Sequence, residues 1–228
     1  MNEIDLSLTL QRFSCRALWH FTGYKKDQEE AFDIQCKILE SSLLKVAKYP
    51  EPILMPNGDE KRWGLPVSCV CDIPFKDLLI HMVRYGQFGI SFHKNDAVTE
   101  GLFNPVLYLH KKADFFDRSS SLLNTIEKNI DQKNPAFETL QEFLSLLGSY
   151  TKRSDLLHPA TIDTKKDESQ NNNFYFEREW RSTHDWDFND KSIAAIMMPS
   201  SYICRFRKKF EDRFPDSSII SSELVETL

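Results

Sequence analysis

Hydrophobic and polar residues alternate in several short stretches of the chain, and this period of two predicts β-strands. In the first stretch, residues 16–23, Ala17, Trp19 and Phe21 share one face, which we expect to point into the core. A continuous apolar run predicts a more deeply buried strand at residues 193–198. The predicted strands cover residues 16–23, 64–73, 85–92, 104–109, 174–181 and 193–198.

Other segments repeat their apolar residues with a helical period. Prolines mark the limits of these segments, because proline fits the first turn of a helix and interrupts its interior. Pro74 opens a short helix, and Pro135 separates two amphipathic helices that form an all-helical insertion. The predicted helices cover residues 27–49, a short stretch after 74, 119–150 and 205–213, whereas residues 217–228 stay unassigned.

The order of these elements predicts a mixed α+β fold, in which helices cover one or both faces of a sheet. No internal repeat is visible, and the polar segments are too short to link separate domains. We therefore expect a single domain over residues 1–228, with a helical insertion at 119–150 and a mobile polar loop at 159–173.

The composition is that of a globular protein: of its 228 residues, 41% are hydrophobic and 28% charged, and the net charge is -5. Without a large basic excess the chain is not expected to bind nucleic acid backbones wholesale, although a local basic groove that includes Arg178 and Arg181 stays open. No apolar run approaches the roughly 18 residues of a membrane span, and no leader pattern is visible. We expect a soluble, cytoplasmic protein with no membrane partner.

Sequence motifs for several common chemistries are missing. The six histidines show neither an i, i+4 pair nor a His-Glu-x-x-His motif, so no metal is expected. There is no Gly-x-x-x-x-Gly-Lys phosphate loop and no Gly-x-Ser-x-Gly motif of a serine nucleophile. The five cysteines lack a Cys-x-x-Cys pair, and we expect them to be reduced, buried thiols.

The predicted strand at residues 174–181 carries the most unusual face of the chain. Its period of two places Tyr175, Glu177, Glu179 and Arg181 on one side and three aromatic residues with one arginine on the other. A solvated strand edge usually mixes uncharged polar residues, so this charged face is our candidate site. The alternative is an ion pair between Glu179 and Arg181 on an exposed strand, which would contribute little.

The predicted strand at residues 85–92 offers a second surface. Phe88 and Phe92 share one face, while Gly89 and Ser91 leave the other face nearly bare. We expect that another group could lie across the bare face.

Four motifs carry a family resemblance. They are Leu-Trp-His-Phe-Thr at 18–22, Cys-Asp-Ile-Pro at 71–74, Tyr-Gly-Gln-Phe-Gly-Ile-Ser-Phe at 85–92 and Asn-Pro-Val-Leu-Tyr at 104–108. Together they resemble the AbiGi family of bacterial abortive-infection phage-resistance proteins. The resemblance spans residues 16–110 and resumes at 179–181, without the helical insertion. It implies the antitoxin half of an abortive-infection pair.

A histidine on the first strand, an aromatic residue on a middle strand and a glutamate on a late strand are also similar to the His-Tyr-Glu pattern of ADP-ribosyltransferase folds. This resemblance implies a split mixed or antiparallel sheet core and NAD as the substrate. It implies that His20 binds the ribose and Tyr85 stacks on the nicotinamide. Glu179 would then stabilise the oxocarbenium-like transition state. The further implied substrate-binding residues are Phe21, Thr22, Phe88, Phe92, Glu177 and Arg181.

Structural alternatives exist for the implied catalytic residues. His20 lies beside a tryptophan and a phenylalanine, as a structural histidine does, and Tyr85 could end the helix that follows Pro74. Three functions therefore stand as hypotheses. The first is an NAD-dependent ADP-ribosyltransferase in phage defence that modifies a protein or nucleic-acid target. The second is an antitoxin that neutralises a partner toxin or represses its promoter through the helical insertion. The third is a degenerate transferase fold that senses a nucleotide.

Overall fold

A computed structural model describes residues 15–47, 53–54, 60–61, 64–110, 113–129, 133–154, 174–210, 213–214 and 217–226. The chain forms two compact units. The first unit consists of Met1–Leu44, Val70–Phe103 and Trp186–Leu228, and the second consists of Lys45–Cys69 and Asn104–Asp185. The expected single domain stays a prediction. The polar loop predicted at 159–173 lies outside the described residues.

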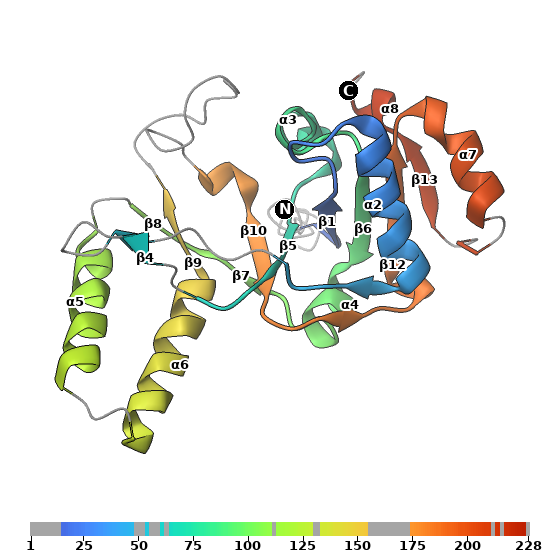
Figure 1. The fold of residues 1–228 in the computed structure, drawn as a ribbon. Helices are drawn as coiled ribbons and strands as arrows, with labels where there is room; N and C mark the ends of the chain where they lie inside the picture. The colour runs from blue at the N-terminus through green and yellow to red at the C-terminus, as the bar shows by residue number, and fades with distance from the viewer. Residues whose placement is uncertain are drawn as a thin grey trace, which may run out of the picture. The chain divides into compact units, whose positions relative to one another are not determined.

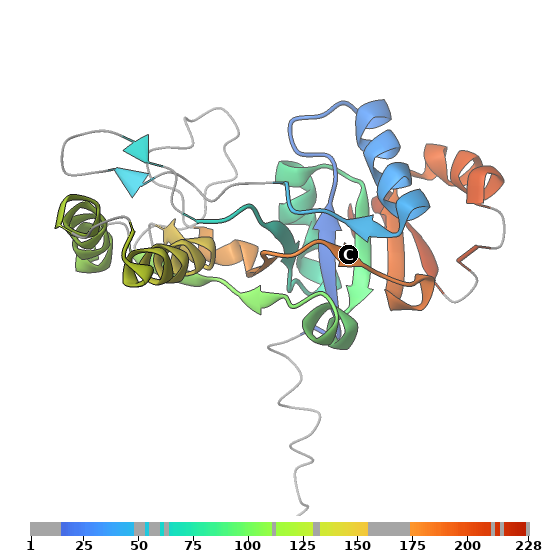
Figure 2. The ribbon, with the colours of Figure 1, turned by 60° about the horizontal axis from the view of Figure 1, so that its bottom comes forward.

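The fold is α+β, with a seven-stranded mixed sheet and flanking helices, as the order of the predicted elements suggested. Figures 1 and 2 show the strands and helices from two directions. In the first unit the strand order is β13-β12-β6-β1-β5, and Val70 and Cys71 are the residues of β5 that belong to this unit. These strands are β1 (Ala17–Phe21), β5 (Ser68–Cys71), β6 (Gly89–His93), β12 (Ile193–Met198) and β13 (Ser218–Ser221). All neighbours described here pair antiparallel except β12 and β13, which run parallel.

Sequence signals place several elements of the first unit. The strands predicted at 16–23 and 193–198 are confirmed as β1 and β12. The helix predicted at 205–213 is α7 (Ser200–Phe210), and the unassigned C-terminal residues form β13 and α8 (Ser222–Glu226). The short elements of this unit are β2 (Leu43–Leu44), η2 (Phe75–Asp77), α3 (Leu78–Tyr85), α4 (Lys94–Thr99), β11 (Trp186–Asp187) and η4 (Asp190–Ser192).

The long helix of the first unit is shorter than its sequence period predicts. Helix α2 (Gln28–Ser41) begins after Asp27, whose carboxylate accepts a hydrogen bond from the Glu30 backbone N–H at 2.8 Å. It ends at Ser42, which has a φ of 50° in the left-handed region. The prediction that the helix continues to residue 49 is wrong, because the backbone reverses at Ser42 and then forms β2.

Both faces of the first unit's sheet are covered. On one face, Trp19 and Met197 pack with Leu78 and Met82 of α3 and with Val225 of α8. Figure 1 shows α3 and α8 among the elements around this sheet. The burial of Trp19 confirms the predicted core face of β1.

The opposite face of the same sheet is equally buried. The Phe92 ring lies 4.9 Å from Trp186 and 5.0 Å from Phe188, and Phe88 lies 6.1 Å from Phe32 of α2. A sheet covered on both faces buries both sides of its strands. Leu18 of β1 is therefore buried as well, although the sequence predicted one core face for this strand.

The second unit contains a parallel strand pair joined by two helices. Strands β8 (Leu107–His110) and β9 (Thr151–Ser154) pair in parallel. Helices α5 (Asp114–Asn129) and α6 (Pro135–Ser149) connect them and lie side by side in Figures 1 and 2. The two predicted amphipathic helices of the insertion are therefore confirmed. The remaining strands of the unit are β3 (Ile53–Leu54), β4 (Glu60–Lys61), β7 (Asn104–Pro105) and β10 (Glu179–Ser182).

Two predicted strands of the second unit are interrupted. The stretch at 104–109 divides into β7 and β8, because its backbone changes partner. The Val106 N–H still donates to the Glu179 carbonyl at 2.9 Å, whereas the Leu107 N–H donates to the Tyr150 carbonyl at 2.8 Å. The stretch at 174–181 begins as a 3-10 helix, η3 (Phe174–Glu177), and only then becomes β10. Arg178 separates these two parts with a φ of 43°. The predicted alternation of faces across residues 174–178 is therefore wrong.

Candidate functional site

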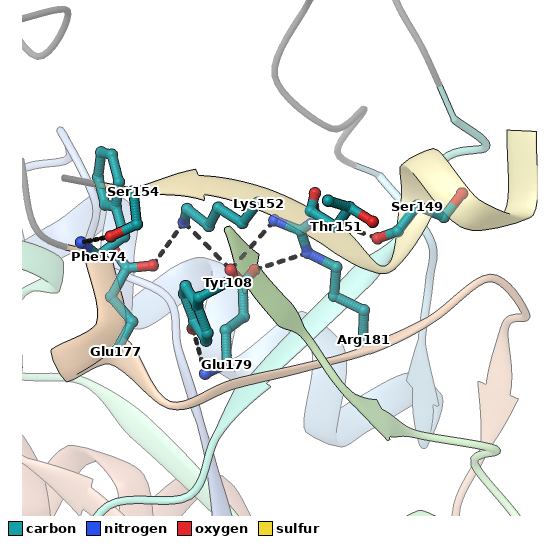
Figure 3. Close-up of polar contacts among 9 residues, drawn as sticks. All are labelled: Tyr108, Ser149, Thr151, Lys152, Ser154, Phe174, Glu177, Glu179 and Arg181. Atoms are coloured by element: carbon teal, nitrogen blue, oxygen red, sulfur yellow. Dashed lines mark hydrogen bonds and ion pairs between the residues drawn. The ribbon is translucent and has the colours of Figure 1, made fainter. Parts of the chain in front are cut away.

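The candidate site is built on β10, whose period of two puts Glu179 and Arg181 on one face. The Arg181 guanidinium donates from Nε to Glu179 Oε1 at 3.1 Å and from Nη2 to Glu179 Oε2 at 3.1 Å. Figure 3 shows this two-point contact. Such a fork fixes both side chains in one geometry.

A lysine from β9 joins the two glutamates. Lys152 Nζ donates to Glu179 Oε2 at 3.1 Å and also to Glu177 Oε2 (Figure 3). Its ammonium group lies 4.5 Å from the centre of the Phe174 ring. Lys152 therefore bridges η3 and β10, which hold the two carboxylates. We call Lys152, Glu177, Glu179 and Arg181 the charge network.

The charge network is buried and carries two positive and two negative charges. Glu177 is 2% exposed, Glu179 7% and Arg181 4%. The expected charged strand face is therefore not an exposed ion pair, because the four charges neutralise one another inside the second unit. Buried charges are tolerated in proteins when they are paired and hydrogen-bonded in this way.

Backbone and hydroxyl groups complete the contacts of the network. Arg181 Nη1 donates to the Ser149 carbonyl at 2.9 Å, at the end of α6. The Tyr108 hydroxyl accepts a hydrogen bond from the Glu179 backbone N–H at 2.7 Å. The network thus links β10 to β8, to β9 and to the helix that precedes β9 (Figure 3).

Electrostatics fix the charge states of the network. Burial alone would raise the pKa of Glu179, but Lys152 and Arg181 outweigh it and hold that pKa below its usual range. Burial would lower the pKa of Arg181, and Glu179 more than offsets this effect and raises it. Burial raises the pKa of Tyr108 well above its usual range. Glu179 and Arg181 are therefore held in their charged forms at neutral pH, and Tyr108 in its neutral form.

The sequence prediction found three members of this site and missed others. Glu177, Glu179 and Arg181 do lie together, although Glu177 reaches the cluster from a 3-10 helix. Lys152 and Tyr108 were not identified. The available sequence signal was the position of Lys152 directly after the helical insertion. In the structure, the parallel pairing of β8 and β9 sets Lys152 opposite Tyr108.

The predicted residues His20, Phe21, Thr22 and Tyr85 belong to the first unit. The Phe21 ring lies 6.4 Å from the Tyr85 ring. Because side chains alternate along a strand, His20 points to the opposite face of β1 from Phe21. The Thr22 hydroxyl, on that opposite side, donates to the Ala31 carbonyl of α2 at 3.0 Å. The structure thus does not bring His20 and Tyr85 to one face.

Phe88 and Phe92, predicted to bind substrate, are core residues of the first unit, at 1% and 0% exposure. The face at Gly89 and Ser91 is not bare. A Cβ at Gly89 would lie 3.3 Å from the Trp19 ring, and Ser91 is buried. Large neighbours therefore fill the space that the small residues leave. A substrate-binding role for these aromatic residues, and the combination of His20, Tyr85 and Glu179, remain predictions.

No group of three or more His, Cys, Asp or Glu side chains in the described parts of the chain could hold a metal ion. No helix in those parts has the length and apolarity that crossing a bilayer requires. Of the free cysteines, Cys36 is buried whereas Cys204 is exposed, so the prediction that all five thiols are buried is wrong.

Comparison with known proteins points to phage defence. A family model described as "Putative abortive phage resistance protein AbiGi, antitoxin" matches residues 51–215. The chain therefore belongs to the AbiGi family. The match contains the whole charge network and the α5–α6 pair, and it begins after His20. The family likeness thus extends over the helical insertion, which the sequence resemblance had left out.

A curated relative agrees with this assignment. The chain is 28% identical over 162 residues to "Abortive phage resistance protein AbiGi" of Lactococcus lactis subsp. cremoris. The alignment covers 64% of this chain and 59% of the relative's length. No solved structure matches the chain significantly.

Proposed function

We propose that this chain is the antitoxin of an abortive-infection pair and acts by binding a partner toxin protein. The family description, which contains the word antitoxin, supports this function. An antitoxin of this kind works by occupying its partner and needs no substrate turnover. The chain spans 59% of the length of the curated relative. That this chain alone has the function of the whole relative is therefore part of the proposal.

The observation that carries the proposal is the state of Glu179. Arg181 holds Oε1, and both Arg181 and Lys152 hold Oε2, while the residue is 7% exposed. A carboxylate that stabilises an oxocarbenium-like centre must face the sugar with an available oxygen. It also needs net negative charge at that point. The neutral, closed charge network offers neither, and this favours a structural role for Glu179.

The alternative is an NAD-dependent ADP-ribosyltransferase-like enzyme, or a degenerate form of that fold that senses a nucleotide. It is supported by the Glu-x-Glu pair of Glu177 and Glu179, whose carboxylates share Lys152. In that function His20 and Tyr85 would contact NAD, and the sheet would be of the ADP-ribosyltransferase type. Catalysis would require Glu179 to exchange its contacts with Lys152 and Arg181 for contacts with the ribose.

Growth rescue combined with an NAD assay separates the two functions. We expect bacteria that express the cognate toxin to resume growth when wild-type chain is co-expressed, in proportion to its amount. Purified wild-type chain incubated with labelled NAD should release no more nicotinamide than buffer does. Release of nicotinamide by the wild type, and its loss in a Glu179→Gln variant with an unchanged circular dichroism spectrum, would refute the proposal.

A further inference from the structure

Helix α6 has an apolar surface that the described residues of its own unit leave exposed. Phe143 is 61% exposed and Leu146 is 42% exposed. The two residues are three positions apart, so they are neighbours on the helix surface. A largely exposed phenylalanine in the middle of a helix loses hydrophobic free energy that burial would recover.

Other residues of α6 form its contact with α5. A neighbouring stripe of α6 packs against α5, where Phe137, Leu144 and Ile126 form a buried cluster. Leu140 and Leu147 pack against the same cluster. The apolar arc of α6 is therefore wider than the side it buries, and the excess consists of Phe143 and Leu146.

The charge around the exposed arc has one sign. Glu138 and Glu142 are exposed and lie one turn apart, next to the apolar residues. Residues 135–149 contain no Lys, Arg or His. Within the part of the chain that the structure describes, neither glutamate forms an ion pair. The arc is thus an apolar pair with a negative border.

We propose that this arc of α6 is the surface on which the partner toxin docks. The occupant is a protein surface with an apolar pocket for Phe143 and Leu146, and with Lys or Arg side chains that face Glu138 and Glu142. Aromatic residues at the centre of an interface and complementary charges at its rim are the usual arrangement. This inference rests on the proposed antitoxin function and names the surface that performs it.

A second apolar surface provides a matched control. Helix α3 exposes Leu79, Ile80 and Val83, of which Val83 is 51% exposed. This surface belongs to the first unit, and the only charged residue among Leu78–Tyr85 is Arg84, so the acidic border of α6 has no counterpart there. Substitution of Val83 thus removes exposed apolar area from a surface outside the proposed one.

The test is calorimetric titration of the purified cognate toxin with full-length variants. Phe143→Ser should weaken binding at least about tenfold, as truncation of a central interface residue does. Val83→Ser should leave Kd within about twofold, because scattered surface contacts contribute little. Charge reversal in Glu138→Lys/Glu142→Lys should weaken binding several-fold at low salt and reduce the salt dependence. Circular dichroism checks the fold of each variant.

The outcomes distinguish this inference from the function on which it rests. Tight binding by the wild type and equally tight binding by Phe143→Ser overturn the docking surface and leave the antitoxin function standing. Absence of binding and of growth rescue by the wild type overturns both. If light scattering shows a wild-type dimer that Phe143→Ser dissociates without weakening toxin binding, the occupant is a second copy of this chain and the inference is wrong.

Discussion

Replacement of Lys152 by methionine is the sharpest test of a structural role for the charge network. Methionine keeps most of the length of the side chain and removes its charge. At the observed 3.1 Å between Lys152 Nζ and Glu179 Oε2, a charge pair interacts by roughly 5 kcal/mol at an effective dielectric constant of about 20. The substitution also removes the ion pair between Lys152 and Glu177, whose side chain is 2% exposed.

Part of this Coulomb energy is offset, because the variant no longer buries an ammonium group. Breaking a buried pair by removing one partner typically costs about 3–5 kcal/mol, and we expect Lys152→Met to fall in this range. For a chain of this length the unfolding midpoint should drop by roughly 10 °C. Urea denaturation followed by circular dichroism, together with thermal melting, measures both quantities.

The matched control is Lys209→Met. Lys209 pairs with Glu40 at 2.8 Å, but both side chains are about half exposed, so the midpoint should not change measurably. The double variant Lys152→Met/Glu177→Gln should lose less stability than the sum of its single variants, because the charges are removed together. If Lys152→Met is no more destabilising than Lys209→Met, solvent screens the network and the argument against an open catalytic site fails.

Three further predictions concern stability. The folded-state pKa of Glu179 lies below its ordinary value of 4.5. The unfolding free energy should therefore be constant above pH 6 and fall as the pH drops through 4.5 toward the folded-state pKa. Urea midpoints from pH 7 to 3 measure this change, and a flat profile contradicts the prediction. Gln35→Leu should lower the unfolding free energy measured by urea denaturation by about 2–3 kcal/mol. The reason is that the buried Gln35 amide donates at 3.0 Å to carbonyls of both β6 and β12. A decrease below about 0.5 kcal/mol would show that these bonds are dispensable. Gly86→Ala should lower the melting temperature by several degrees. Gly86 has a φ of 86°, and an added Cβ would lie 2.8 Å from the Cα of Gly23. An unchanged melting temperature would contradict this close approach of the two backbone segments.

Local signals account for the elements that were predicted correctly. The apolar run at 193–198 has the bounds of β12, and Asp27 marks the start of α2 through its cap. The end of α2 was missed because Ser42 adopts a left-handed conformation that glycine usually signals. Likewise, the aromatic alternation from residue 174 fits a strand, but Arg178 takes a positive φ that no local pattern announces.

The candidate site was predicted only as far as one strand reaches. The shared face of Glu179 and Arg181 follows from the period of two along β10. Lys152 lies 27 residues before Glu179, and only the parallel pairing of β8 with β9 brings it there. Burial is a tertiary property as well, so the sequence showed an unusually charged face and not its internal neutralisation. The sequence thus showed which residues of this strand are charged, but not which residues pair with them.

Calorimetric titration of the cognate toxin with the wild-type chain tests the central claim most directly. The antitoxin function predicts a saturating titration at a fixed molar ratio with a Kd below about 1 µM, as expected for a stable protein pair. A titration without heat or saturation, from a chain that is folded and releases nicotinamide from NAD, would contradict it.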